Sequence, residues 1–184
     1  MAHVSIIGTG NMGQVIAGVV SKGGNTVELL GSGDTDKPAT GDVVVLAVYY
    51  GSIADVIGQR GAELAGKVVV DITNPLNVET FDSLVVPADG SATAEIAAAL
   101  PESRVVKATL ASGTVGGLPT TVLIAGDDAD AKSLLAGIVT GGGLRAIDAG
   151  SLQRARELEA LGFLQIGLAA GEKIGWTGGF AVIA

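Results

Sequence analysis

The stretch SIIGTGNMGQ, residues 5–14, spaces three glycines as Gly8-x-Gly10-x-x-Gly13. This spacing matches the dinucleotide-binding fingerprint, in which a strand turns tightly into a helix whose first amides bind a diphosphate. Glycine accounts for 29 of the 184 residues. On the order of one such match is therefore expected by chance, and the surrounding sequence has to decide what the pattern means.

The residues on either side of the glycines favour the fingerprint. An apolar run at 3–8 precedes them, and apolar side chains recur at helical spacing through 11–22. The motif therefore lies between a strand and a helix. There, Gly8 would permit the tight turn, Gly10 would let a pyrophosphate approach the backbone, and Gly13 would allow the helix to pack closely on the sheet. The alternative is that the glycines only shape a strand-to-helix turn.

Short apolar runs alternate with helical patterns along the rest of the chain. Further strands are expected at 26–31, 42–48, 67–73, 104–109, 120–125 and 144–148, and helices at 53–64, 91–100, 128–139 and 151 to about 173. This alternation predicts an α/β fold with a Rossmann-type, doubly wound, mostly parallel sheet. We expect one NADP-binding domain over 1–184, with 151–184 forming a C-terminal helix and tail that pack on the sheet or at a dimer interface.

Composition excludes several classes of function. The formal charge of −8 argues against a nucleic-acid partner, which would need clustered Lys and Arg. The absence of cysteine excludes disulfides and thiolate metal sites. There is no signal-peptide pattern and no run of 18 apolar residues, so we expect a cytoplasmic protein without a membrane partner.

The end of the second expected strand bears on which dinucleotide is bound. NAD-binding proteins usually place an acid there for the ribose hydroxyls, whereas this chain has Leu30-Gly31-Ser32. Ser32 could donate to the 2′-phosphate of NADP, and Lys37 could add charge. Asp34 and Asp36 would repel that phosphate unless they point to solvent. NADP is favoured over NAD, with an ordinary polar loop as the alternative for Ser32 and Lys37.

Several segments together resemble one family. They are GTGNMG (8–13), the Gly-Ser after the second strand, DVVVLAV (42–48), GKVVVDITNPL (66–76), TTVLIAGDDADAK (120–132), DAGSLQRARELEALG (148–162) and WTGGFAV (176–182). The chain is similar over nearly its full length to the coenzyme F420-dependent NADP reductases, which transfer hydride between NADP(H) and a deazaflavin. The resemblance implies a small-molecule acceptor and a homodimer.

The resemblance also implies where the nucleotide binds. NADP would be held by Ser32 and by the turn made of Gly8, Thr9, Gly10, Asn11, Met12 and Gly13. Its nicotinamide end would lie near the residues that follow two strands, Ala47, Val48 and Tyr49 after one and Thr73, Asn74 and Pro75 after the other.

Three departures from the family pattern concern the phosphate and acceptor sites. Gly33 replaces an arginine, and Tyr49 replaces a proline. The Ala-Phe-Asn-Thr run expected after Lys107-Ala108 is absent, which would leave the acceptor pocket shorter or open.

No general base is evident, so we assign no catalytic residue. The only histidine, His3, opens the first strand at the edge opposite to the one where such sheets bind ligands. Hydride transfer between a nicotinamide and a flavin-like ring needs little acid-base help, because the cofactors carry the chemistry. The sequence therefore predicts an NADP(H)-dependent oxidoreductase with a deazaflavin, a flavin or a similar acceptor. The alternatives are a non-catalytic NADP(H)-binding redox sensor and, less favoured, a hydroxy-acid dehydrogenase.

Other polar residues have two interpretations each. Tyr49 could stack on or bond the nicotinamide or the acceptor, or be an ordinary amphipathic residue at the end of a strand. Asn74 could bond a carboxamide or belong to an ordinary turn. Lys107 is expected to be a solvated strand-end lysine rather than a proton donor or an acceptor-binding cation. The acids Asp127, Asp128 and Asp130 are expected to cap a helix rather than bind a metal. A solvated helix face is expected for Arg154, Arg156, Glu157 and Glu159, opposite an apolar stripe of Leu152, Ala155, Leu158, Leu161, Leu164 and Leu168.

Overall fold

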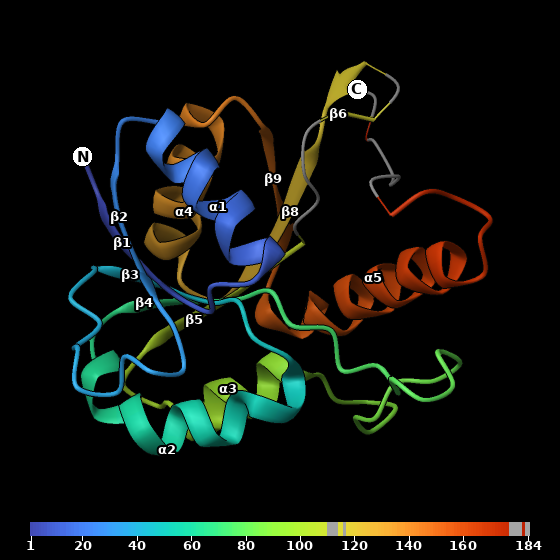
Figure 1. Ribbon diagram of the computed structural model, residues 1–184, viewed down its shortest axis with the longest axis horizontal. Helices are drawn as coiled ribbons and strands as arrows, with labels where there is room; N and C mark the ends of the chain where they lie inside the picture. The colour runs from blue at the N-terminus through green and yellow to red at the C-terminus, as the bar shows by residue number, and fades with distance from the viewer. Residues whose placement is uncertain (110–113, 116, 177–181, 183–184) are drawn as a thin grey trace.

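Seven strands form one sheet in the computed structural model, which describes residues 1–109, 114–115, 117–176 and 182. Their order across the sheet is β2-β1-β3-β4-β5-β8-β9 (Figure 1). The strands pair in parallel except at β5 and β8. Their bounds are β1 His3–Ile7, β2 Thr26–Leu30, β3 Val43–Leu46, β4 Val68–Asp71, β5 Arg104–Ala108, β8 Thr121–Gly126 and β9 Arg145–Gly150. A separate antiparallel pair is made by β6 Thr114–Val115 and β7 Leu118–Pro119.

Helices cover both faces of this sheet. The helices α1 (Asn11–Lys22) and α4 (Ala129–Gly141) lie on one face, and α2 (Ile53–Leu64) and α3 (Ala92–Ala99) lie on the other (Figure 1). The fifth helix, α5 (Ala155–Ala170), begins beside α3 and extends away from the sheet. Two single 3-10 turns, η1 (Tyr50–Ser52) and η2 (Leu152–Arg154), precede α2 and α5.

Strand alternation divides the core into two layers. Val43 and Val45 of β3 pack with the layer under α1 and α4, whereas Val44 and Leu46 pack with the layer under α2 and α3. All four side chains are at most 3% exposed. Because both faces are buried, β3 reads as a continuous apolar run, as central strands of parallel sheets do.

These observations confirm the fold class. All seven expected strands are present, and the helices at 11–22 and 53–64 have the expected bounds. The C-terminal helix ends at Ala170, slightly before the expected end near residue 173. The sequence did not predict β6, β7 or the two 3-10 turns.

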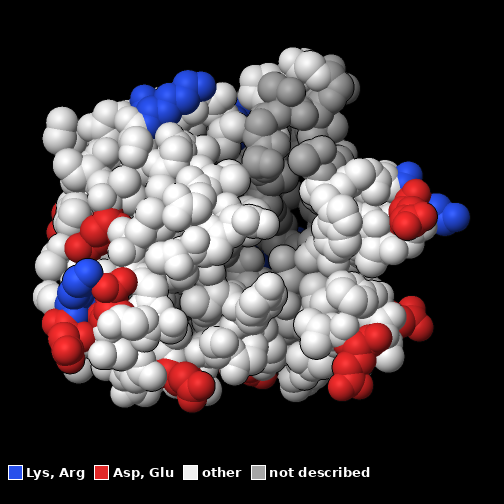
Figure 2. All heavy atoms as spheres, in the orientation of Figure 1, with Lys and Arg blue, Asp and Glu red and all other residues white. Residues whose placement is uncertain are grey.

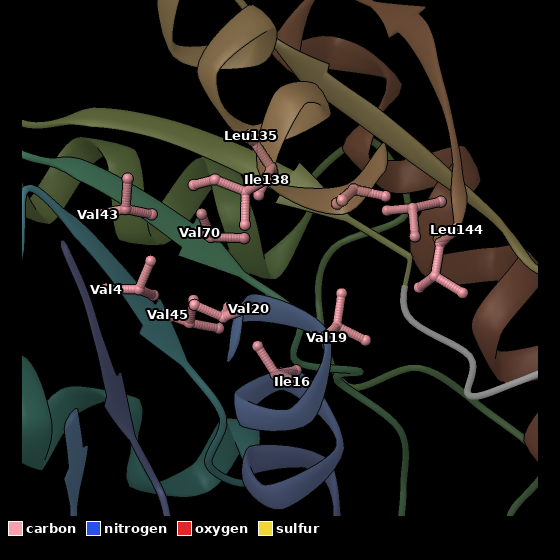
Figure 3. A pocket seen from close by; sticks show the side chains of 12 residues that line it. Val4, Ile16, Val19, Val20, Val43, Val45, Val70, Leu135, Ile138 and Leu144 are labelled. Atoms are coloured by element: carbon pink, nitrogen blue, oxygen red, sulfur yellow. The ribbon is translucent and has the colours of Figure 1, made fainter. Parts of the chain in front are cut away.

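The core layer under α1 and α4 contains a cavity of about 30 Å³. Aliphatic side chains from the sheet and both helices line it, among them Val45, Ile16 and Leu135 (Figure 3). A void of this size with no polar lining is a packing defect that stays dry. The functional site therefore has to be sought at the edge of the sheet.

Candidate nucleotide-binding site

The strand order reverses at β1, which lies between β2 and β3. In doubly wound sheets, ligands bind at this reversal, beyond the carboxyl ends of the strands. The ends of β2, β1, β3 and β4 follow one another along this edge and span about 14 Å at the usual strand spacing. The residues that the sequence assigned to the nucleotide follow these four strands, so the fold brings them to one edge.

The first and third glycines of the fingerprint are required by close backbone contacts. Gly8 has a φ of +122°, and a Cβ there would lie 2.1 Å from the carbonyl oxygen of Ala47. A Cβ on Gly13 would lie 2.0 Å from the carbonyl oxygen of Gly8. Any larger residue at either position would push the turn away from β3 or from α1. The predicted tight turn and close packing are both present.

Gly10 is different, because a Cβ there would meet no atom of the described chain within 4 Å. Gly10 is the N-cap of α1, has no side chain to cap the helix, and precedes a first turn without acidic residues. The helices α3 and α4 are capped instead by the side chains of Ser91 and Asp128. The first amides of α1 thus have no side-chain cap, as at helix starts that bind anions, and the space beside Gly10 is open. Thr9, Asn11 and Met12 are exposed beside this space.

After β2, Ser32 is exposed and so accessible to a ligand. The Asp34 side chain, by contrast, is only partly exposed and has partners within the protein. One carboxylate oxygen of Asp34 accepts the amide proton of Gly31 at 2.8 Å, and the other lies 2.7 Å from the Lys37 ammonium. The hydrogen bond from Lys37, together with that from Gly31, holds the pKa of Asp34 below its ordinary value. The Lys37 charge that was expected to serve a phosphate is therefore already paired with a carboxylate.

The residues after β3 and β4 differ in exposure. Tyr49 is 84% exposed, Ala47, Val48 and Asn74 are half-buried, and Pro75 is buried. The carboxamide of Asn74 packs against α5, where a Cβ on Gly162 would lie 2.3 Å from the side-chain oxygen. Within the described residues this carboxamide has no hydrogen-bond partner, so it remains able to bond a ligand.

Tyr50, next to the predicted Tyr49, is unsuited to acid-base chemistry. Its hydroxyl donates to Glu95 at 2.5 Å. This hydrogen bond, with burial and the neighbouring negative charge, raises the pKa of Tyr50 to about 12. The raised pKa makes this phenol a weaker proton donor than an ordinary tyrosine.

A buried ionic cluster lies below the ends of β4 and β5. The Lys107 ammonium lies 3.0 Å from Asp71 and 3.4 Å from Glu159, and it also donates to the carbonyl oxygen of Thr73. The hydroxyl of Thr93 lies 2.6 Å from Asp71 and 3.1 Å from Glu159. All five residues are at most 2% exposed. The prediction that Lys107 is a solvated strand-end lysine was wrong, because partners from β4, from the segment after β4 and from α5 keep it in the core.

Glu159 also corrects the prediction of a solvated face on α5. Its carboxylate accepts the amide protons of Ala92 and Thr93, so it caps α3 from a distance. The start of a helix favours negative charge, which compensates for the second carboxylate of the cluster. The signal was spacing, because Glu159 follows Ala155 by four residues and thus lies on the buried stripe. The other three residues of the proposed face, Arg154, Arg156 and Glu157, are exposed as expected.

The remaining candidates have structural roles. Asp128 caps α4 by accepting from the amide of Ala131 at 2.7 Å, and Asp130 lies in the first turn of that helix. Asp127 caps η2 instead, by accepting from the amide of Leu152. The described residues contain no group of three or more potential metal ligands. His3 lies at the opposite edge of the sheet, between the hydroxyls of Thr26 and Thr40.

Figure 2 shows the molecule in the orientation of Figure 1, and its face is hollowed between the sheet and α5. The described surface beside the hollow is mostly uncharged, and most of the charged side chains lie toward the outline. The helices in the described part of the chain lack the length and hydropathy needed to cross a bilayer. The doubly wound sheet and the glycine turn at this edge are those of the dinucleotide-binding class of proteins.

Comparison with known proteins identifies the family. The chain is 32% identical over 160 residues to the F420-dependent NADP reductase of Methanocaldococcus jannaschii, a match covering 82% of this chain and 72% of that protein. The chain therefore belongs to the F420-dependent NADP reductase family, whose members are NADP-dependent oxidoreductases. It is also 32% identical over 126 residues to the rat metalloreductase STEAP3, with coverage of 65% of this chain but only 24% of that protein. No family model matches.

Solved structures support the fold. A protein from Arthrobacter sp. FB24, proposed to be an F420-dependent NADP reductase, superposes over 100% of both chains with a TM-score of 0.85 and 24% identity. The 3-hydroxyisobutyrate dehydrogenase of Mycobacterium tuberculosis matches with a TM-score of 0.64 and 15% identity, over 95% of this chain and 66% of that one. At these identities the likeness concerns the fold alone.

Proposed function

We propose that this protein binds NADP(H) at the start of α1 and transfers hydride between it and a deazaflavin, a flavin or a similar acceptor. The observation that carries the proposal is the uncapped start of α1. Gly10 supplies open space, the first amides of α1 supply donors, and no acidic side chain of the first turn competes for them. This arrangement suits a diphosphate better than any polar group of the protein itself.

The positions of the residues assign a role to each strand end. In the proposal, Gly10 and the amides of Asn11, Met12 and Gly13 bind the diphosphate, flanked by Gly8 and Thr9. Ser32 binds the ribose end of the nucleotide beyond β2, where Lys37 reaches a 2′-phosphate only in competition with Asp34. The reactive ring is oriented by the residues after β3 and β4, namely Ala47, Val48, Tyr49, Asn74 and Pro75. When bound, the nucleotide supplies or accepts the hydride.

Two features support an acceptor whose reaction needs no base from the protein. They are the surface beside α5 and the buried cluster around Lys107. The described surface beside the hollow next to α5 is mostly uncharged (Figure 2), which suits a flat, neutral ring. The titratable groups below the ends of β4 and β5 are bonded to one another and at most 2% exposed. They hold the Thr73 carbonyl in place rather than reach a ligand.

Substituting Gly10 tests the binding site directly. A Cβ at this position meets no described atom within 4 Å, and the methyl groups of a valine would extend into the space proposed for the diphosphate. We expect Gly10→Val to weaken NADPH binding in calorimetry by at least about ten-fold, because the amides lose access to the anion. Gly18→Ala is the matched control, since Gly18 lies on the same helix and is also free of contacts. Equal affinities in the two variants would contradict the proposal.

Turnover requires a second experiment. NADPH oxidation would be followed with a panel of deazaflavin, FMN, FAD, quinone and ferric chelates. Acceleration by a deazaflavin or a flavin supports the proposal. Binding without acceleration by any acceptor would overturn the reductase proposal and favour the redox-sensor alternative.

A homodimer through α5 belongs to the same proposal. Leu164, part of the apolar stripe expected to pack on the sheet, is 53% exposed. Figure 1 shows α5 extending away from the sheet, which supports a second copy as the partner of this side. Sedimentation of Leu164→Glu should show a monomer where the unmodified protein gives a dimer. A dimer in both would contradict this interface.

A further inference from the structure

The turn after β2 is rigidly built around Asp34. The amide of Asp34 donates to the carbonyl of Gly31 at 3.1 Å, and its carboxylate accepts from the amide of Gly31 at 2.8 Å. From α2, the guanidinium of Arg60 donates to the carbonyls of Asp34 and Lys37. Arg60 itself is only 5% exposed. The position of the Asp34 carboxylate is thus fixed by backbone bonds and a buried cation.

This carboxylate lies where the adenosine ribose of a dinucleotide would bind. A Cβ on Gly31 would lie 3.5 Å from a carboxylate oxygen of Asp34 and 3.5 Å from the methyl of Thr9 in the fingerprint turn. The end of β2 beside that turn is the place where an acid of NAD-binding proteins bonds the ribose hydroxyls. Asp34 follows Gly31 by three residues, and its side chain folds back to the end of β2. The sequence position at the strand end is therefore a glycine, although a carboxylate lies beside it.

Asp34 also determines what Lys37 can do. The Lys37 side chain is 71% exposed but its ammonium lies 2.7 Å from Asp34. A 2′-phosphate arriving here would meet a fixed negative charge and a lysine that this charge already holds. Ribose hydroxyls would meet a carboxylate with lone pairs to spare.

We infer that Asp34 is a specificity-determining residue that opposes the 2′-phosphate of NADP(H) and accepts hydrogen bonds from the ribose hydroxyls of NAD(H), so that the site binds both nucleotides. The inference rests on the proposed nucleotide site and concerns only its choice of ligand.

Calorimetry with NADPH and NADH tests this inference without an acceptor. The unmodified protein should bind the two nucleotides with affinities within about ten-fold of each other. Asp34→Asn keeps an oxygen for the amide of Gly31 but removes the charge. It should strengthen NADPH binding and weaken NADH binding, moving their ratio by about ten-fold. Asp36→Asn, an exposed neighbour in the same loop, should change each affinity less than about two-fold.

If Asp34 only stabilised the loop, its substitution would change the NADPH and NADH affinities in the same direction, not in opposite directions. If Asp34→Asn changes both affinities in the same direction, or leaves their ratio unmoved, the inference is wrong. Lys37→Ala provides a second check, since it should weaken NADPH binding more in the Asp34→Asn background than alone. An equal effect in both backgrounds would overturn the claim that Asp34 holds Lys37. Failure of the unmodified protein to bind either nucleotide would instead overturn the proposed site.

Discussion

Two buried hydroxyls in the described residues, those of Thr73 and Thr121, have no hydrogen-bond partner. Thr73 lies below the proposed site, but Thr121 begins β8, a strand outside that edge, and is 7% exposed. A buried polar group without a partner loses its bonds to water and gains none in return. The unpaired hydroxyl of Thr121 therefore destabilises the fold and has no evident role in binding.

Replacing Thr121 by valine should stabilise the protein. The two side chains have the same shape, and valine suits a buried strand without the cost of the hydroxyl. We expect Thr121→Val to raise the free energy of unfolding by about 1 kcal/mol in urea denaturation. Thr93→Val is the contrasting variant, because its hydroxyl bonds Asp71 at 2.6 Å and its loss should destabilise. Destabilisation by both variants would contradict this account of Thr121.

At the level of single residues, the sequence predicted what depends on neighbours along the chain. Gly8 adopts a positive φ, and Gly13 packs against the carbonyl of Gly8, both within one turn of the chain. The spacing of the two glycines in the sequence was enough to predict this turn. The burial of Lys107 and Glu159 depends on Asp71 and Thr93, which are distant in the sequence. For Lys107 no local pattern carries that information, and for Glu159 only its spacing from Ala155 does, so both were expected at the surface.

At the scale of elements, α5 is attached to the rest of the protein through Glu159. This single carboxylate meets two amides of α3, the hydroxyl of Thr93 and the ammonium of Lys107. Breaking a buried ionic cluster from one side leaves an uncompensated charge. We expect Glu159→Gln to lower the free energy of unfolding by about 3 kcal/mol in urea denaturation. Glu157→Gln, exposed on the same helix, should stay within about 0.5 kcal/mol of the unmodified protein; similar losses in both would disprove the role of the cluster.

Helix α5 also fixes Asn74 at the proposed site. An alanine at Gly162 has to displace the Asn74 carboxamide, although alanine favours a helix over glycine by up to about 1 kcal/mol. Gly162→Ala should therefore fold but lower kcat for NADPH oxidation by about ten-fold. Gly167→Ala in the same helix makes only an ordinary 3.7 Å contact and should retain activity. Steady-state kinetics that cannot separate the two variants would exclude this function for Asn74.

Whole elements were predictable where a period is long enough to read. The helices at 11–22 and 53–64 were expected at their observed bounds because each is twelve residues long. The strands β6 and β7 have two residues each, too few to show any alternation. The 3-10 turns η1 and η2 are similarly short.

For the molecule as a whole, the sequence predicted the layered α/β architecture but not the direction of every strand in the sheet. Continuous apolar runs indicate that a strand is buried on both faces, and β8 is such a run. They do not indicate whether its neighbour runs parallel to it. The antiparallel pairing of β5 and β8 is therefore a feature that this sequence pattern did not indicate.

One carboxylate joins three segments at the edge opposite the site. Glu28 of β2 accepts hydrogen bonds from Ser5 of β1 and from the amide and hydroxyl of Thr40, just before β3. Burial raises the pKa of Glu28, but these hydrogen bonds outweigh it and hold the pKa below its ordinary value. A carboxylate whose pKa is lowered by folding stabilises the fold above its unfolded pKa. That contribution is lost as the pH falls through the folded pKa.

Protonation of Glu28 should therefore account for part of the loss in the free energy of unfolding at acid pH. Between about pH 7 and about pH 3, the free energy of unfolding should fall by less in Glu28→Gln than in the unmodified protein, because the amide does not titrate. The difference should be on the order of 0.5 kcal/mol, since the carboxylate is partly exposed and solvent screens it. Glu79→Gln, an exposed loop residue, should follow the unmodified protein across this range. Parallel pH profiles for all three proteins would show that the Glu28 cluster does not couple folding to pH.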